Sequence, residues 1–333
     1  MKRKIAVYAI SKNEEAFAER WFSSMREADE IVVLDTGSAD KTAQRLRNLG
    51  ARVYEKKIDP WRFDEARNDA LSFVSKDADI CVSTDLDEVF SPGWRRALEE
   101  KWNENTTRAR FKYVWSLKED GAEGTVLYLD KIHARNGYNW HYPVHEALVR
   151  TDGKKDLPDN YVTLDGVCLY HYPDKRKSRA QYLPLLELSY RENPHDPRAA
   201  HYLGREYMYL GRWKDALFML DQHVHMPMSL WKEEKCASYR YMGRCHMHLG
   251  DMKSAEAAFM NAICLSPHLR EGYYELANLL YLKKEYAGCV HFCMKALEIT
   301  KRPSEYMSED AAWNGNIENL LREANSALRA SVQ

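Results

Sequence analysis

Short apolar runs alternate with amphipathic stretches through the first 85 residues, and this alternation most narrows what the chain can fold into. The apolar runs predict strands, and the stretches between them space their apolar residues as helices do. Strands and helices in alternation pack as a parallel sheet covered by helices. The predicted strands are 4–10, 30–34, 52–54 and 80–84, and the predicted helices are 11–25, 40–49 and 64–75.

Acidic residues crowd the end of the fourth strand, where Asp85, Asp87 and Glu88 fall within four positions. Carboxylates this close repel one another unless a positive group joins them. Hard divalent cations with oxygen ligands, Mg²⁺ or Mn²⁺, suit such a group. The alternative is a solvated acidic turn. Because ligands bind beyond the carboxyl ends of parallel strands, the polar stretches 11–14 and 35–38 are expected in the same crevice.

Helix boundaries can also be predicted from single residues. Asn13 is a plausible N-cap of the first helix, with Glu14 in its first turn, where the helix dipole favours an acid. Asp64 is the expected N-cap of the third helix, and Gly50 is expected to end the second. Ser91 is the expected cap of a fourth helix over 94–104.

Composition bounds the class of protein. A chain of 333 residues is long enough for two domains, and its net charge of −1, from 49 basic and 50 acidic residues, gives no reason to expect nucleic acid as a partner. No apolar run is long enough for a membrane span, and no export signal is evident. Seven scattered cysteines without a Cys-x-x-Cys pair suggest reduced, buried thiols and a cytoplasmic location. The chain lacks Gly-x-Gly-x-x-Gly and Walker A motifs, which argues against dinucleotide oxidoreductases and P-loop phosphotransferases.

Four short motifs occur in the order and spacing of one enzyme family: 5–15, 31–42, 63–71 and 84–88. Together they resemble family-2 glycosyltransferases of the GT-A fold. The resemblance implies an α/β nucleotide-sugar-binding domain over residues 1–180, with a mostly parallel sheet. It also implies a UDP-sugar donor, Mn²⁺ or Mg²⁺ at the Asp-x-Asp (DXD) motif, and hexosyl transfer with inversion at the anomeric carbon.

The same resemblance implies a role for particular residues. Asp35 would hydrogen-bond the uracil, Asp85 would contact ribose or metal, and Asp87 would bind the metal that bridges the diphosphate. The other residues expected beside the nucleotide are Asn13, Glu14, Arg67 and Asn68. Each has a plainer alternative: Asp35 could cap helix 40–49, Arg67 and Asn68 could be solvated, and Glu14 could be a dipole-favoured acid.

Beyond the acids, alternating aromatic residues predict an antiparallel hairpin of strands 108–117 and 126–132. A later strand, 161–170, ends at His171. By resemblance to GT-A enzymes His171 is expected to join the metal shell, the alternative being a surface histidine. The basic run 175–179 could be solvated or could clamp a diphosphate.

An inverting transfer needs a base that takes the proton of the acceptor. Residues 135–146 are polar and aromatic with little periodicity, which is typical of a site loop. Glu146 is the leading candidate for this base, with His145 beside it. Asp120, Asp130 and a purely structural role for Glu146 stay open as alternatives.

The second half of the chain is continuously helical in pattern and repeats itself. The segments 203–216 and 242–255 align at an offset of 39, and a third copy follows at an offset of 34. This resembles about three tetratricopeptide repeats, and implies an all-α solenoid over residues 181–333 with helix 316–330 as its cap. Small residues at matching positions would let the helices pack closely. His223/His225 and His246/His248 are not expected to bind metal as pairs, because His-x-His neighbours on a helix point to different faces.

These observations favour an inverting, metal-dependent glycosyltransferase. Similar fusions are bacterial enzymes that glycosylate peptides or surface glycans. The acceptor is therefore expected to be a peptide, protein or glycan that the repeats recruit, and the repeats could also form a homodimer. The alternatives are an inactive transferase domain that serves as a scaffold, and a nucleotidylyl- or phosphotransferase on the same sheet.

Overall fold

The structure is a computed structural model that describes residues 3–153, 158–174, 181–303 and 308–332. The chain divides into two compact units, Met1–Arg179 and Ala180–Gln333. The basic run at 175–179, expected to be solvated or to clamp a diphosphate, lies outside the described residues.

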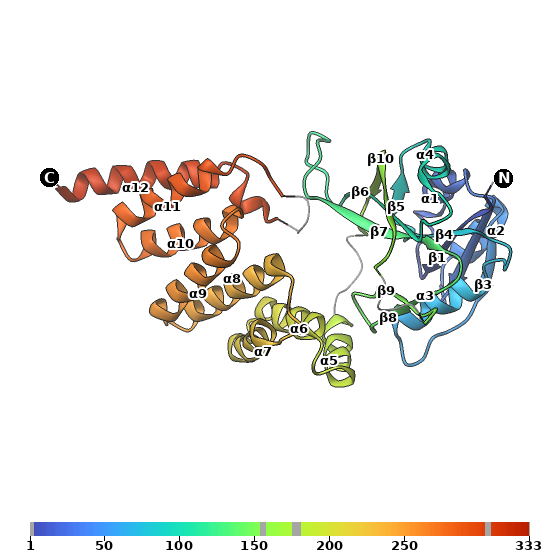
Figure 1. Ribbon diagram of the computed structural model, residues 1–333, viewed down its shortest axis with the longest axis horizontal. Coiled ribbons are helices and arrows are strands. Elements are labelled where there is room, and N and C mark those ends of the chain that lie inside the picture. The colour runs from blue at the N-terminus through green and yellow to red at the C-terminus, as the bar shows by residue number, and fades with distance from the viewer. Residues whose placement is uncertain (1–2, 154–157, 175–180, 304–307, 333) are drawn as a thin grey trace. The chain divides into compact units, whose positions relative to one another are not determined.

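The first unit is built on one eight-stranded sheet with the strand order β3-β2-β1-β4-β7-β6-β10-β5 (Figure 1). The half with β3, β2, β1 and β4 is parallel, whereas β7 and β5 run antiparallel to their neighbours. The sheet is therefore mixed. Its strands are β1 (Ile5–Ser11), β2 (Glu30–Asp35), β3 (Arg52–Glu55), β4 (Ile80–Ser83), β5 (Glu88–Phe90), β6 (Arg108–Val114), β7 (Val126–Ala134) and β10 (Tyr161–His171).

Each face of the sheet carries its own apolar core because successive residues of a strand point to opposite sides. Val7 of β1 lies in the core under helices α1 (Ala18–Met25), α2 (Thr42–Leu49) and α4 (Trp94–Lys101). Its neighbour Tyr8 lies in the core under helix α3 (Phe63–Ser72) on the other face. Both side chains are fully buried.

A separate two-stranded hairpin shares the core of α3. Its strands, β8 (Tyr138–His141) and β9 (Ala147–Arg150), pair antiparallel with each other and form a sheet of their own. The interpretation of 135–146 as a loop was therefore wrong for its middle part. Buried Tyr138 and Trp140 alternate with exposed Asn139 and His141, which is the period of two that marks a half-buried strand.

Three predicted helix caps were also wrong. Helix α1 begins at Ala18, because Asn13 takes a left-handed backbone with φ of 55° and stays outside the helix. Asp64 lies within the first turn of α3, whose N-cap is Arg62. Ser91 accepts a hydrogen bond from the backbone N–H of Cys168 and leaves the cap of α4 to Gly93.

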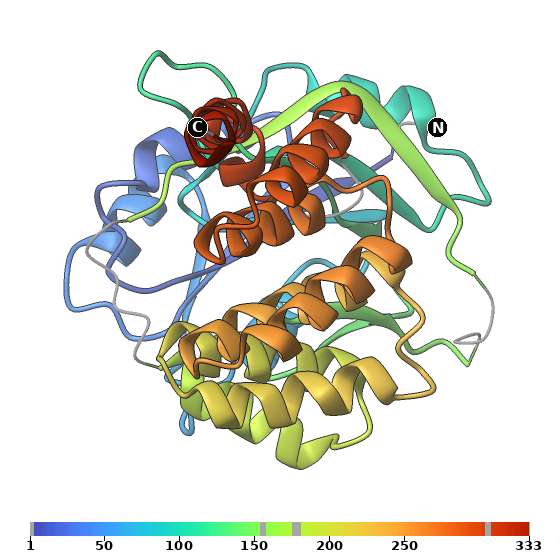
Figure 2. The same cartoon turned by 90° about the vertical axis from the view of Figure 1, so that its left-hand side faces the viewer.

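The second unit is helical throughout its described secondary structure, and consecutive helices pack as antiparallel pairs (Figure 2). Among the described residues the pairs are α6 with α7, α8 with α9, and α10 with α11, and α12 packs on the last. The bounds are α5 (Tyr182–Glu192), α6 (Pro197–Tyr209), α7 (Trp213–His225), α8 (Lys232–His248), α9 (Met252–Leu265), α10 (Arg270–Leu282), α11 (Tyr286–Glu298) and α12 (Asn316–Val332).

Small residues allow close approach inside the first two pairs, as the repeat predicted. A Cβ added at Gly204 would lie 2.7 Å from Leu220 Cγ, and one added at Gly243 would lie 2.6 Å from Phe259 Cζ. Gly204 and Gly243 are 39 residues apart, and so are Leu220 and Phe259. The sequence repeat is therefore a repeat of one packing contact, which is how tetratricopeptide-like helix pairs stack.

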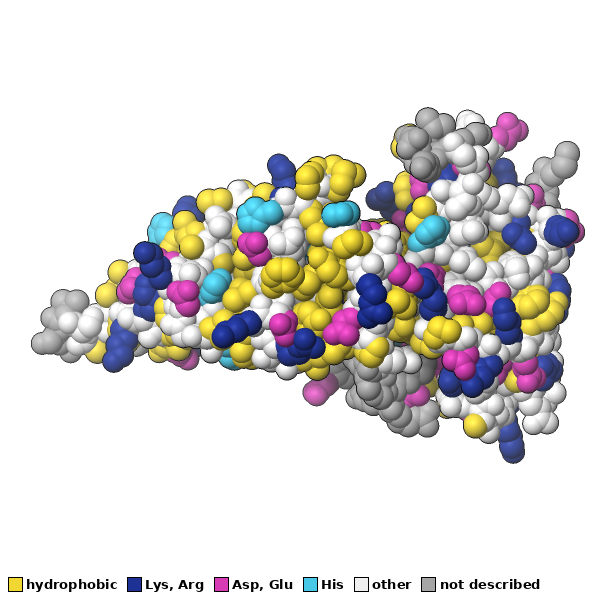
Figure 3. Space-filling view, turned by 90° about the horizontal axis from the view of Figure 1, so that it is seen from below, with side chains coloured by type: hydrophobic (Ala, Val, Ile, Leu, Met, Phe, Trp, Pro, Cys, Tyr) yellow, Lys and Arg dark blue, Asp and Glu magenta, His cyan; other side chains and the backbone are white. Residues whose placement is uncertain are grey.

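The surface of the helical unit carries large apolar side chains, which gather on the face shown in Figure 3. Phe218, Met228 and Leu230 are each more than 60% exposed. None of the described helices is long and apolar enough to cross a membrane. All seven cysteines are unpaired thiols; five are buried, but Cys168 is half-buried and Cys264 is exposed.

Candidate functional site

The carboxyl ends of β1, β2 and β4 meet at one edge of the sheet. Ser11 at the end of β1 lies in register with Asp35 at the end of β2, and β4 ends one strand away at Ser83. The polar residues after these strands are held at this edge by the parallel pairing itself.

The carboxylate of Asp35 is fully hydrogen-bonded within this edge. Its Oδ1 accepts from the backbone N–H groups of Gly37 and Ser38, at 3.0 and 2.7 Å. Its Oδ2 accepts from the hydroxyls of Ser11 and Ser38, at 3.0 and 2.6 Å. Asp35 thus shapes the turn between β2 and α2 and does not cap the helix. A uracil group would have to replace one of the hydroxyl donors.

Hydrogen bonds tie Asn13 and Glu14 to the same turn, through both backbones and the side chain of Asn13. The N–H of Asn13 donates to Ser38 Oγ, and its Oδ1 accepts from the N–H of Ala39 at 2.7 Å. The N–H of Glu14 donates to Thr42 Oγ1 at 2.8 Å. These cross-links between the β1 and β2 loops explain why Asn13 adopts a left-handed backbone instead of starting a helix.

Two of the acids after β4, Asp85 and Glu88, pair with cations from two other elements. Asp85 Oδ1 accepts from Arg67 Nη2 of α3 at 2.8 Å, and its Oδ2 lies 3.2 Å from Lys131 Nζ of β7. Lys131 Nζ also lies 3.3 Å from Glu88 Oε1. The second Glu88 oxygen accepts the backbone N–H of Asp85 at 2.9 Å, which closes the turn.

Burial and these charges shift the pKa values of Asp85, Lys131 and Glu88. Burial alone would raise the pKa of Asp85, but the charges of Arg67 and Lys131 outweigh burial and hold it well below its usual range. Burial would lower the pKa of Lys131, and here Asp85 and Glu88 outweigh it and raise the pKa. Glu88 is more deeply buried, and burial raises its pKa.

Arg67 joins the acids to the hairpin. Its side chain is 5% exposed, and its Nε donates to Glu146 Oε1 at 2.5 Å while Nη2 binds Asp85. The guanidinium also lies over the ring of Trp140, 5.2 Å from the centroid. Asp85 and Glu146 outweigh burial and raise the pKa of Arg67, so the guanidinium remains a permanent cation.

Asp87 and His171 come together because two strands pair. In the antiparallel register of β5 and β10, His171 stands opposite Glu88, so His171 Nε2 lies 3.5 Å from Asp87 Oδ2. The other ring nitrogen, Nδ1, bonds the carbonyl of Trp115, whose ring stacks on the imidazole. Burial would lower the pKa of His171, but the hydrogen bond and charge of Asp87 raise it above its ordinary value.

Glu146 lies in the loop of the hairpin, immediately before β9. Tyr142 and His145 in this loop have positive φ values of 80° and 52°, a strained backbone for residues other than glycine. Within the described part of the chain, no hydrogen bond reaches the second oxygen of Glu146, Oε2. The structure therefore brings Glu146, Arg67 and Asp85 into one chain of contacts, with His145 next in the loop.

The remaining predicted residues have structural partners. Asn68 does not point to solvent: its amide exchanges two hydrogen bonds of 2.8 Å with the backbone of Trp140 and fastens the hairpin to α3. Asp130 pairs with Arg108 on the sheet. Asp120 is exposed and accepts the N–H of Ala122 in the turn of the β6–β7 hairpin.

Sequence reasoning missed Lys131 and left Glu88 without a role. Lys131 lies in strand β7 with its side chain only 19% exposed, and a charged side chain at such a position is unusual unless it is paired. The acid-rich end of β4 needed a cation, but only the β4–β7 pairing identifies which strand supplies it.

The first unit is also similar in sequence to known proteins. Residues 7–151 match the family model "Glycosyl transferase family 2". An uncharacterized glycosyltransferase of Rickettsia bellii (strain RML369-C) is 35% identical over 92 residues, which is 27% of this chain and 30% of that protein. Another, of Rickettsia typhi (strain ATCC VR-144 / Wilmington), is 40% identical over 60 residues, 18% of this chain and 20% of its own length. The matches thus span less than a third of these relatives.

Two solved structures are similar to part of this chain at low sequence identity. The TPR2B domain of yeast Sti1, in a complex with pHsp70, is 20% identical with a TM-score of 0.32, and the match covers 39% of this chain and 96% of that one. MamA is 18% identical with a TM-score of 0.33, and the match covers 44% of this chain and 77% of that one. The packing repeat described above identifies the second unit as tetratricopeptide-like without them. Residues 7–151 are thus a glycosyl transferase family 2 domain, followed in the same chain by tetratricopeptide-like helices.

Proposed function

We propose that the protein is an inverting glycosyltransferase that moves a hexosyl group from a UDP-sugar to an acceptor, with Mn²⁺ or Mg²⁺ bound at the Asp-x-Asp motif. The observation that carries the proposal is the meeting of Asp87 and His171 at the carboxyl edge of a family 2 domain, 3.5 Å apart although 84 residues separate them. Asn13, Glu14, Asp35, Arg67 and Asn68 would form or support the nucleotide side of the site.

The donor set suits a hard divalent ion. Four carboxylates lie in this network (Asp85, Asp87, Glu88 and Glu146), and two permanent cations, Arg67 and Lys131, balance only half of them. Arg67 and Lys131 occupy both oxygens of Asp85. We therefore assign direct metal binding to Asp87 and His171, and assign Asp85 to the ribose or the outer metal shell. A bound ion would stabilise the charge that grows on the departing diphosphate.

Glu146 is suited to act as the general base that deprotonates the acceptor. Arg67 holds one of its oxygens, which fixes the orientation of the carboxylate and leaves Oε2 to take a proton. His145 is one residue away in the same strained loop. The strain is consistent with a loop whose shape serves the reaction rather than stability.

The acceptor is proposed to be a peptide, protein or glycan, recruited by the helical unit. Large apolar side chains exposed on its surface support a role in binding other chains.

The test is calorimetric titration of the full chain with UDP, GDP and ADP in the presence and absence of Mn²⁺, followed by UDP-sugar hydrolysis. We expect Mn²⁺-dependent UDP binding that Asp87→Asn weakens by at least about tenfold, as lost metal ligands do. Glu146→Gln should bind UDP normally and lose transfer.

Asp120→Asn, on the exposed β6–β7 turn, is the matched control and should leave UDP binding unchanged. Equal UDP binding with and without Mn²⁺, or by wild type and Asp87→Asn, would contradict the metal assignment. If UDP-sugar is bound but never hydrolysed or transferred, the transferase domain is an inactive scaffold instead.

A further inference from the structure

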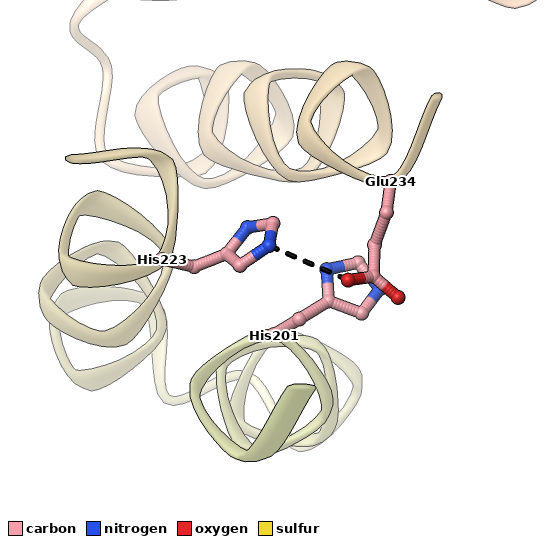
Figure 4. Close-up of side chains that lie close together, drawn as sticks. All are labelled: His201, His223 and Glu234. Atoms are coloured by element: carbon pink, nitrogen blue, oxygen red, sulfur yellow. Dashed lines mark ion pairs between the residues drawn. The ribbon is translucent and has the colours of Figure 1, made fainter. Parts of the chain in front are cut away.

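A buried cluster of metal-ligand side chains lies inside the helical unit, in the part of the chain with no proposed chemistry (Figure 4). It consists of His201 from α6, His223 from α7 and Glu234 from the first turn of α8. One ligand atom from each lies within 4.8 Å of the others, and all three residues are buried. We propose that this cluster binds a divalent transition metal ion, with Zn²⁺ as the best match, and that the ion joins the first helix pair to the second.

The chemistry of the three side chains supports a metal over a purely polar core. Two imidazoles and one carboxylate form a ligand set that zinc takes in proteins. The carboxylate of Glu234 is buried, and among the described residues it pairs with no lysine or arginine; its ion-pair partner is His223, with Nε2 3.5 Å from Oε1. A buried anion is costly unless a positive charge accompanies it. A divalent ion would supply that charge.

A shared serine sets the tautomers that a metal requires. Ser238 Oγ lies 2.8 Å from Nδ1 of His201 and 2.8 Å from Nδ1 of His223, and the serine is fully buried. A hydroxyl oxygen has two lone pairs, so it can accept both Nδ1–H groups at once. That arrangement turns the Nε2 lone pair of each ring to the side of the cluster away from the serine. Metal-bound histidines regularly donate their other N–H in this way.

The spacing requires only a small movement. Zinc–nitrogen bonds of about 2.0–2.1 Å place the ligands of a tetrahedral ion roughly 3.4 Å apart. His223 Nε2 and Glu234 Oε1 already have this spacing, at 3.5 Å. Metal binding would therefore require mainly that the His201 ring move closer to the other two ligands. Ser229 Oγ, 3.0 Å from His223 Nε2, lies on the same side and could complete the shell itself or through water.

This inference is independent of the proposed transferase site, and the test separates the two. The full chain carrying Asp87→Asn, which removes a proposed ligand of the Mn²⁺/Mg²⁺ site, is stripped with a chelator. It is then titrated with Co²⁺, followed by visible absorption, and with Zn²⁺ in competition with a chromophoric chelator. We expect one equivalent of Co²⁺ with the ligand-field bands of nitrogen and oxygen coordination, displaced by Zn²⁺, and a higher melting temperature with Zn²⁺.

Variants locate the ion. His223→Gln and Glu234→Gln should each weaken Zn²⁺ by more than about 100-fold, and Ser238→Ala by about 10–100-fold, the usual loss for an outer-shell partner. His225→Gln is the matched control: it stands two residues from His223 on the same helix, but its side chain is 70% exposed and points away, so Zn²⁺ affinity should not change. Circular dichroism checks that each variant folds. If His223→Gln does not fold, the Zn²⁺ affinity of Glu234→Gln tests the proposal in its place. Absence of a Co²⁺ spectrum, or Zn²⁺ affinity unchanged by Glu234→Gln, would overturn the proposal.

Discussion

Replacing Arg67 by methionine tests the claim that one buried guanidinium holds the site together. Methionine keeps an unbranched apolar stem but has no guanidinium, so it leaves Asp85 and Glu146 without their shared cation. Removing one partner of a buried ion pair costs about 3–5 kcal/mol. Asp85 keeps Lys131 and is one-third exposed, so we expect the low end, about 3 kcal/mol at pH 7.

The pH dependence of this loss has a definite sign. The folded-state pKa of Asp85 lies below its ordinary value of about 3.9, so its ion pairs stabilise the fold fully above that pH and cease to do so as acid titrates the folded carboxylate. The difference in unfolding free energy between wild type and Arg67→Met should therefore be largest near neutral pH and should shrink below about pH 4.

Urea unfolding at two pH values measures the difference, and hydrogen exchange of the β4 amides assigns it to the first unit. Arg96→Met is the matched control, because Arg96 pairs with Glu100 on the surface of α4 with an 85% exposed side chain, and it should cause no measurable change. A loss for Arg67→Met as small as that of Arg96→Met, or one that is the same at both pH values, would refute the reasoning.

Three further substitutions probe other contacts. Asn68→Ala removes both amide bonds to the backbone of Trp140 and should destabilise the hairpin by roughly 1–2 kcal/mol, seen as faster hydrogen exchange in β8. Gly243→Ala places a methyl group in overlap with the ring of Phe259, whose Cζ would be 2.6 Å away, and overpacking of this kind should cost about 1–3 kcal/mol and lower the melting temperature. Lys131→Met leaves Glu88 without its cation and Asp85 with Arg67 alone, and should cost about 3 kcal/mol in urea unfolding at neutral pH.

Conservative variants control these three experiments. Lys131→Arg keeps the charge and should recover most of the stability, and a full loss would argue for packing instead. A methyl group at Gly272 would come no nearer than 3.1 Å to its neighbours, at Ile263 Cγ1, so Gly272→Ala should be far milder than Gly243→Ala. Hydrogen exchange in β8 that is unaffected by Asn68→Ala would mean that the apolar core alone holds the hairpin.

The sequence predicted the parallel half of the sheet because long-range order there follows from local pattern. Apolar strands separated by helices leave little choice of arrangement, and the acids after β4 had to lie at the carboxyl edge with Asp35. The helix pairs were predictable for a similar reason, since Gly204 and Gly243 occupy equivalent places in a repeat.

The failures occurred where distant residues decide local structure. Asn13 looks like a helix cap, but its bonds to the loop at 38–39 pull it into a left-handed turn. Strands β8 and β9 pair with each other and are four residues long each. An alternation of buried and exposed residues over so few positions is too short to recognise in the sequence. Lys131 could be assigned to the acids only after the partner of β4 was known.

The position of Arg67 has a consequence for how this protein can change over time. Its guanidinium serves two carboxylates that belong to different elements, one after β4 and one in the hairpin loop. A substitution at either carboxylate alters the environment of the other, so their effects should not add. In a lineage of such chains, Asp85 and Glu146 are therefore expected to be retained or replaced together, with Arg67 as the source of their epistasis.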